Sequence, residues 1–287
     1  MLSYIHAFHA GNYGDILKHA VFAFTLQHLL KKEKPFCVID THSGSGKYAL
    51  DDERLLKTCE AQCGIQKLLK APYSDLKKIF GKDFLSILEL YVKKGLYPGS
   101  PEIARTFLRE RDQLILNELH PKVFEELKLN IKSPALTQNA KQNSPSIILN
   151  QKDAKIMLNA NIPPKIKRGC VIIDPSYEDA DDYEQTAQMF VSAYKKWPTG
   201  TYLIWYPLLS HRQLEIEYLK QNVIATVEKT NNTEDKKAVF YEIIIKKEEE
   251  MTGLAKMYGS GMLVINPPYG LNEKMEESIP LIEKALR

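Results

Sequence analysis

The sequence predicts an α/β protein with a doubly wound, mainly parallel sheet of seven strands and a small helical insertion. Short apolar runs bounded by turn signals alternate with amphipathic stretches along most of the chain, which is typical of strands and helices that build such a sheet. The first strand runs directly into a glycine-containing loop. Residues 51–95 contain helical patterns and no convincing strand. These three observations define the fold class.

The seven predicted strands are apolar runs that end at a polar or turn-forming residue. They lie at 36–39, 114–116, 147–149, 170–173, 202–205, 239–245 and 262–265, and the last two are predicted to form an antiparallel pair. Helices are predicted over residues 15–30 and 181–197, and another begins at Pro121, because proline is favoured in a first helical turn. Ser100 is predicted to cap a further helix that begins at Pro101.

The domain organisation follows from the strand-free stretch. We expect residues 1–50 and 96–287 to form a Rossmann-like domain, interrupted by a helical insertion subdomain over residues 51–95. The chain has 287 residues, 44% of them hydrophobic and 26% charged, which excludes disorder or a coiled coil as the main state.

The composition also limits the compartment and the partners. Apolar runs are too short to span a bilayer, and the first residues do not have the pattern of a signal peptide. No Cys-x-x-Cys pair occurs among the four cysteines, so we expect reduced thiols and no zinc site. The net charge of +3 does not reveal a nucleic-acid binder. We therefore predict a cytoplasmic protein without a metal, a membrane anchor or an obligate protein partner.

The loop after the first strand reads DTHSGSGKYA over residues 40–49. Two glycines at this place allow a tight turn and a close approach of the backbone to a ligand. The pattern fails the phosphate-binding motif of nucleoside triphosphatases at two positions, and it matches the dinucleotide motif only weakly. The third interpretation is S-adenosylmethionine, for which an acid at the strand end is followed by spaced glycines, as Asp40, Gly44 and Gly46 are here. An ordinary strand–helix turn is the plain alternative.

Glu118 ends the second predicted strand. In a cofactor-binding α/β fold, a carboxylate at this place can accept hydrogen bonds from both ribose hydroxyls. The helical insertion accounts for the long distance in sequence between this acid and the glycine loop. Taken alone, Glu118 would be read as a solvated loop acid.

The fourth predicted strand ends in Asp174-Pro175-Ser176-Tyr177, which resembles the signature of methyltransferases that act on exocyclic amino groups. A carboxylate and a main-chain carbonyl can accept both amino hydrogens, and an aromatic ring can stack on the base, so that positioning carries most of the catalysis. We predict Asp174, Pro175 and Tyr177 as the catalytic group. A second tetrad, residues 266–269, follows the last strand, and we interpret it as a structural turn.

The segment before the first strand is dense in polar side chains. Residues 4–19 include three histidines, an asparagine, an aspartate and a lysine, at spacings that match no familiar zinc pattern. A helix from Asp15 would carry Lys18 and His19 in its first turns, within reach of a ligand. A capping cluster without a ligand is the alternative.

Motifs spread over almost the whole chain resemble the RlmJ family, the ribosomal RNA large subunit methyltransferases J. They are YIHAFHAGN at 4–12, DILKH at 15–19, DTHSGSG at 40–46, YPGSP at 97–101, ELHP at 118–121, IDPSYE at 173–178, GTY at 200–202, WYP at 205–207 and GMLVINPP at 261–268. The resemblance implies a Rossmann-like, S-adenosylmethionine-dependent enzyme that forms N6-methyladenine in 23S ribosomal RNA. Ser176 and Ala154 depart from the proline and the glycine of the family pattern.

The resemblance and the residues together give a predicted site. The predicted cofactor-binding residues are Lys18, His19, Asp40, His42, Gly44, Gly46, Ser100, Glu118, Asp153, Ala154 and Asp174, and the predicted substrate-binding residues are Tyr4, His6 and Tyr177. The substrate would be naked or partly assembled 23S ribosomal RNA. Two alternatives stay open: the same reaction on DNA, since a flipped adenine is alike in both, and a nucleic-acid-binding protein linked to the uptake and catabolism of external DNA.

Overall fold

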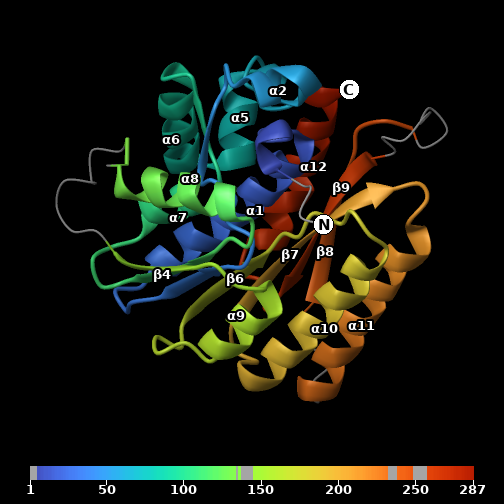
Figure 1. The fold of residues 1–287 in the computed structure, drawn as a ribbon. Helices are drawn as coiled ribbons and strands as arrows, with labels where there is room; N and C mark the ends of the chain where they lie inside the picture. The colour runs from blue at the N-terminus through green and yellow to red at the C-terminus, as the bar shows by residue number, and fades with distance from the viewer. Residues whose placement is uncertain (1–4, 134, 137–144, 232–237, 248–256) are drawn as a thin grey trace.

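The computed structural model describes residues 5–133, 135–136, 145–231, 238–247 and 257–287, and its centre is a seven-stranded mixed sheet (Figure 1). The strands are β1 (Cys37–Asp40), β4 (Gln113–Asn117), β5 (Ser146–Asn150), β6 (Gly169–Ile173), β7 (Thr201–Leu209), β8 (Ala238–Ile244) and β9 (Met257–Ile265). Their order is β5-β4-β1-β6-β7-β9-β8. The first five are parallel, and β9 runs antiparallel to both β7 and β8. The predicted fold class, including the final antiparallel pair, is confirmed.

Helices cover both faces of the sheet (Figure 1). One face carries α1 (Tyr13–Leu30), α7 (Ser100–Phe107), α8 (Pro121–Lys132) and α12 (Leu271–Leu286), and the other carries α9 (Ala154–Asn161), α10 (Asp181–Lys196) and α11 (Gln213–Asn231). β1, β4 and β6, in the middle of the parallel part, are buried almost throughout, which is why their sequences read as apolar runs, whereas β5 at the edge is partly exposed. Within the described residues, none of the helices combines the length and the apolar character needed to cross a membrane.

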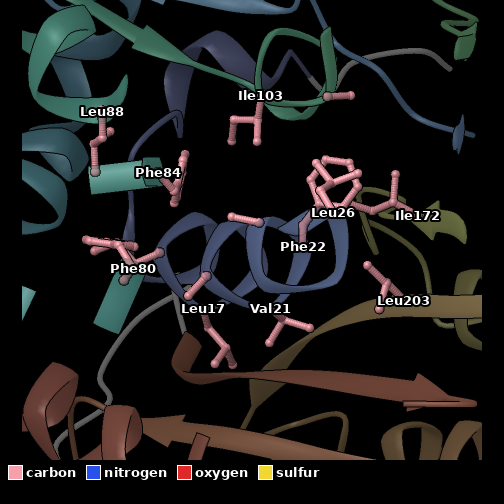
Figure 2. Packing of buried hydrophobic residues seen from close by; sticks show 14 of the residues in the cluster. Leu17, Val21, Phe22, Leu26, Phe80, Phe84, Leu88, Ile103, Ile172 and Leu203 are labelled. Atoms are coloured by element: carbon pink, nitrogen blue, oxygen red, sulfur yellow. The ribbon is translucent and has the colours of Figure 1, made fainter. Parts of the chain in front are cut away.

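Helix α1 lies in the middle of the larger core. It is buried nearly all the way round and mostly apolar, and Leu17, Val21, Phe22 and Leu26 are fully buried. Figure 2 shows why: the sheet, represented by Ile172 and Leu203, packs on one side of the helix, and Phe80, Phe84 and Leu88 of the insertion pack on another. A helix that is apolar all round is stable only when it is enclosed in this way. Burial of each such side chain contributes about 1.5–3 kcal/mol.

Residues 51–95 form short helices and no strand. These are α2 (Glu53–Thr58), α3 (Glu60–Cys63), α4 (Ile65–Leu68), α5 (Tyr73–Phe80) and α6 (Lys82–Lys93). A two-stranded antiparallel ribbon of β2 (Lys47–Ala49) and β3 (Leu96–Pro98) joins the two ends of the stretch. The ribbon is not predicted from the sequence. The apolar residues of these helices belong to the same core as α1 and α12, and the division into two domains stays a prediction.

Candidate active site

Three parallel strands bring the predicted acidic residues to one edge of the sheet. β1 pairs with β4 on one side and with β6 on the other. Asp40 is the last residue of β1, Glu118 directly follows β4, and Asp174 directly follows β6. In open α/β sheets, ligands bind in the crevice at this edge. A cavity of 470 Å³ opens there. The predicted residues that line it are His6, Lys18, His19, His42, Gly44, Ser100, Glu118, Asp153, Ala154, Asp174 and Pro175.

The glycine loop is held against Glu118. Gly44 has a positive φ of 58°, and its N–H donates to Glu118 Oε2 at 2.9 Å. A Cβ atom at Gly44 would lie 2.3 Å from the hydroxyl of the buried Tyr48, so the position requires glycine. Burial raises the pKa of Glu118, although the N–H groups of His120 and Gly44 act in the opposite direction. Gly46 also has a positive φ but packs beneath α8 and does not line the cavity.

Asp40 supports the loop from below. It is buried, its Oδ2 accepts from Ser100 Oγ at 2.7 Å, and its Oδ1 accepts from the His42 N–H at 3.2 Å. Burial raises the pKa of Asp40 to about 7, with the Ser100 hydrogen bond opposing the rise. The expected helix cap at Ser100 is wrong: Gly99 is the N-cap of α7, and Ser100 is its first residue. The Ser100 hydroxyl serves Asp40 and therefore does not cap the helix.

Lys18 links helix α1 to the end of β6. Its ammonium lies 2.6 Å from Asp15 Oδ1 and 2.5 Å from Asp174 Oδ2, and its side chain is 5% exposed. Burial alone would lower the pKa of Lys18, but the two carboxylates raise it above its usual value. Likewise, burial would raise the pKa of Asp15, but Lys18 and His6 hold it well below the usual value. The lysine is thus a fixed positive charge between two carboxylates.

Two predicted cofactor residues are histidines held in the neutral form. Burial lowers the pKa of His19 to about 3 and that of His42 to about 4. His19 Nδ1 lies 2.9 Å from the Tyr97 hydroxyl, and His42 Nδ1 lies 2.8 Å from the hydroxyl of Thr41. Neutral rings beside the cavity can both donate and accept hydrogen bonds.

The low pKa of His19 makes stability depend on pH. The unfolded chain binds a proton at His19 near pH 6.5, whereas the native protein does so only near pH 3. The free energy of unfolding should therefore fall as the pH drops through this window. We expect urea titrations to show a loss about 3 kcal/mol larger in the wild type than in His19→Gln between pH 6.5 and pH 4. Equal losses in the two proteins would contradict the assigned neutral state.

Of the predicted substrate residues that the structure describes, His6 lines the cavity and Tyr177 does not. Tyr4 lies outside the described residues. Tyr177 is 4% exposed and has a positive φ of 51°; its hydroxyl donates to the Trp205 carbonyl at 2.7 Å, and its ring packs against Tyr183. The adjacent Pro175 and Ser176 do line the cavity. Stacking of Tyr177 on a base would require a rearrangement of this turn.

The second tetrad lies at the opposite edge of the sheet. β9 runs antiparallel to β7 and pairs its last residue, Ile265, with Tyr202 near the beginning of β7. Asn266 therefore lies at the edge of the sheet opposite to the one that carries Asp174. Both hydrogens of its amide are used in the turn, because Nδ2 donates to the carbonyls of Pro198 and Gly200 at 2.8 and 2.7 Å. The adjacent Tyr269 is 87% exposed.

Asn117, which the sequence interpretation missed, ties the loops of the site together. It is buried and lines the cavity, and its amide donates to the carbonyls of Thr41 and Lys152 at 3.0 and 2.9 Å. A polar residue at the end of an apolar strand, immediately before Glu118, was the available signal. In the described part of the chain, no group of three or more His, Cys, Asp or Glu side chains could hold a metal ion.

The sheet order, the glycine loop and the acidic residues at the ends of neighbouring strands define a Rossmann-like methyltransferase. Residues 33–287 match the family model described as "Ribosomal RNA large subunit methyltransferase D, RlmJ". The chain belongs to this RlmJ family, which confirms the resemblance seen in the sequence.

Similar proteins match over nearly the whole chain. The chain is 34% identical to the ribosomal RNA large subunit methyltransferase J of Escherichia coli K12 and 36% identical to that of Haemophilus influenzae, each over 289 residues that cover 100% of this chain and 94% of the relative. A crystal structure of a Legionella pneumophila protein is 30% identical, has a TM-score of 0.78, and is matched over 97% of this chain and 94% of its own.

Proposed function

We propose that the protein transfers the methyl group of S-adenosylmethionine to N6 of an adenine in 23S ribosomal RNA. The observation that carries the proposal is the position of Asp174: it ends β6, lines the same cavity as the glycine loop after β1, and is held by Lys18. The substrate class is supported by the family and by its relatives in E. coli and H. influenzae, which are ribosomal RNA large subunit methyltransferases.

The residues of the cavity fit S-adenosylmethionine. Its volume of 470 Å³ lies in the range of small-molecule pockets. Glu118 accepts one N–H on each carboxylate oxygen, from Gly44 and His120, and each oxygen retains a lone pair for a ribose hydroxyl. Asp153 caps α9 at the far side of the cavity, beside Ala154, where the adenine of the cofactor would lie. The bound cofactor would supply an electrophilic methyl group.

Asp174 would act on the amino group of the target base. Lys18 occupies its Oδ2, and Oδ1 has no hydrogen-bond partner in the described part of the chain, so this oxygen can accept one amino hydrogen. The main-chain carbonyl of Pro175 would accept the other. Both contacts orient the nitrogen lone pair toward the methyl group, and the proton that the nitrogen loses leaves along the hydrogen bond to Asp174. Positioning and electrostatics then lower the barrier.

The proposed substrate determines the place and the form of the reaction. Ribosomal RNA is assembled in the cytoplasm, which agrees with the predicted location. A base can enter the cavity only when it is unstacked, so naked or partly assembled RNA should be methylated faster than a perfect duplex. DNA is the alternative substrate, and a role in the uptake of external DNA without catalysis is the other alternative.

Incubation with labelled S-adenosylmethionine tests the proposal. Deproteinised 23S ribosomal RNA, single-stranded DNA and duplex DNA serve as parallel substrates, followed by digestion and mass spectrometry of the nucleosides. We expect N6-methyladenosine from the RNA and at least tenfold less product from either DNA. Product from DNA alone would show that the substrate is DNA and not RNA. The absence of product from every substrate would support the non-catalytic alternative.

A further inference from the structure

The helical insertion holds the segment that precedes helix α1. The Thr58 hydroxyl donates to the Phe8 carbonyl at 2.5 Å, and the Ile65 N–H donates to the Gly11 carbonyl at 2.8 Å. A Cβ atom on Gly64 would lie 2.2 Å from the Gly11 oxygen, so the two backbones are in direct contact. The insertion is thus bonded to the chain immediately before the residues that enter the active site.

Glu60 of α3 makes the side-chain contacts of this junction. Its Oε1 accepts from His9 Nδ1 at 2.8 Å, and its Oε2 accepts from Asn12 Nδ2 at 2.9 Å. A carboxylate can only accept, so it fixes the orientation of the Asn12 amide. The amide oxygen of Asn12 is thereby turned toward the Asp15 N–H, which it caps at 3.0 Å.

The contacts continue from the cap to the catalytic pair. Asp15 Oδ2 accepts from the Gly11 N–H at 2.8 Å, and Asp15 Oδ1 lies 2.6 Å from Lys18 Nζ. Lys18 in turn lies 2.5 Å from Asp174. An unbroken path of hydrogen bonds and ion pairs therefore joins the insertion to the proposed catalytic carboxylate.

We propose that Glu60 is a positioning residue of the methyl transfer: through Asn12 and Asp15 it sets the place of Lys18, and with it the orientation of Asp174. This inference rests on the proposed function. It gives the insertion a role in the reaction in addition to its contribution to the hydrophobic core. Glu60 does not line the cavity, so its effect should be on the rate of transfer and not on the binding of the cofactor.

The substitution Glu60→Ala tests the inference. It removes both acceptor oxygens, so the Asn12 amide loses the contact that fixes its orientation. We expect kcat on 23S ribosomal RNA to fall about tenfold, as small displacements of catalytic groups do, while the KM for S-adenosylmethionine changes less than twofold. Glu89→Ala, on the exposed face of α6 in the same insertion, should match the wild type.

A second pair of variants separates positioning from a general loss of structure. If Glu60 acts through Lys18, adding Glu60→Ala to Lys18→Met should lower kcat no further. Additive losses would overturn the inference, as would an unchanged kcat in Glu60→Ala. Active sites are counted by the stoichiometry of S-adenosylhomocysteine binding, which removes the contribution of unfolded protein. An inactive wild type would defeat the proposed function itself, whereas an active wild type with an unaffected Glu60→Ala defeats only this inference.

Discussion

Replacement of Asp174 by alanine should lower methyl transfer about a thousandfold, which is the largest effect on activity that we expect. The substitution removes a carboxylate that follows β6, that Lys18 holds in place, and that can accept an amino hydrogen. The glycine loop and Glu118 are untouched, so the affinity for S-adenosylmethionine should change at most tenfold, or about 1.4 kcal/mol. Single-turnover assays and calorimetric titrations measure the two quantities separately.

Asn266→Ala in the second tetrad is the matched comparison. It removes the two hydrogen bonds that the amide donates to carbonyls at the opposite edge of the sheet. The free energy of unfolding should fall by about 1–3 kcal/mol, while the molecules that remain folded retain their methyl transfer. The reverse pattern, an inactive but well-folded Asn266→Ala beside an active Asp174→Ala, would show that the active site lies at the Asn266 edge of the sheet and not at the Asp174 edge.

Replacement of Lys18 by methionine should have the largest effect on stability. Its side chain and that of Asp15 are 5% and 1% exposed, and removal of the ammonium leaves two carboxylates without their shared partner. Breaking such a buried pair costs about 3–5 kcal/mol of unfolding free energy. Urea denaturation measures this loss. Methyl transfer should also fall at least about a hundredfold, because Asp174 loses its orienting contact.

Two further variants show whether the activity is lost through stability alone. Lys128→Met removes an exposed lysine that pairs with Glu125 on α8 and should cost less than about 1 kcal/mol. Adding Asp15→Asn to Lys18→Met removes one uncompensated charge and should restore part of the stability without restoring methyl transfer. Recovery of activity in the double variant would show that Lys18 is needed only for folding.

The strands that could be predicted are those whose pattern is local. β1 and β6 are buried on both sides, so their apolar runs give their bounds to within a residue. β7 was predicted over 202–205 but continues to Leu209. In the sequence, Pro207 looks like the end of a strand. In the structure, β6 pairs with β7 only as far as Ile204. The proline, which lacks an N–H group, therefore lies where β7 has no neighbouring strand on that side to which an N–H would donate.

β9 was likewise predicted too short. It begins at Met257, and its glycines resemble a turn in the sequence. In the structure they are required by neighbouring strands: a Cβ atom on Gly261 would lie 2.1 Å from the Tyr206 ring, and one on Gly259 would lie 2.3 Å from the Ile243 carbonyl. Such contacts between distant segments leave no local pattern.

The features of the site likewise divide into those that could be predicted from the sequence and those that could not. Asp40, Glu118 and Asp174 could be predicted because each ends a strand and because parallel strands end at one edge. The pairing of Lys18 with Asp174 joins residues 156 positions apart and depends on how α1 packs beside β6. The burial of Tyr177 against Tyr183 depends on α10 in the same manner. Neither could be derived from spacing along the chain.

The central position of β1 has a consequence for synthesis on the ribosome. Its neighbour β4 pairs Gln113 with Cys37, and its other neighbour β6 pairs Gly169 with the same Cys37. The first residue of β6, Gly169, is made 132 residues after Cys37 of β1. At the usual pace of translation this takes roughly 7–26 s. Until β6 is made, this buried strand can pair with β4 on one side only, and its other side has no partner. The nascent chain should therefore engage chaperones until β6 has emerged, and slower translation should prolong that dependence.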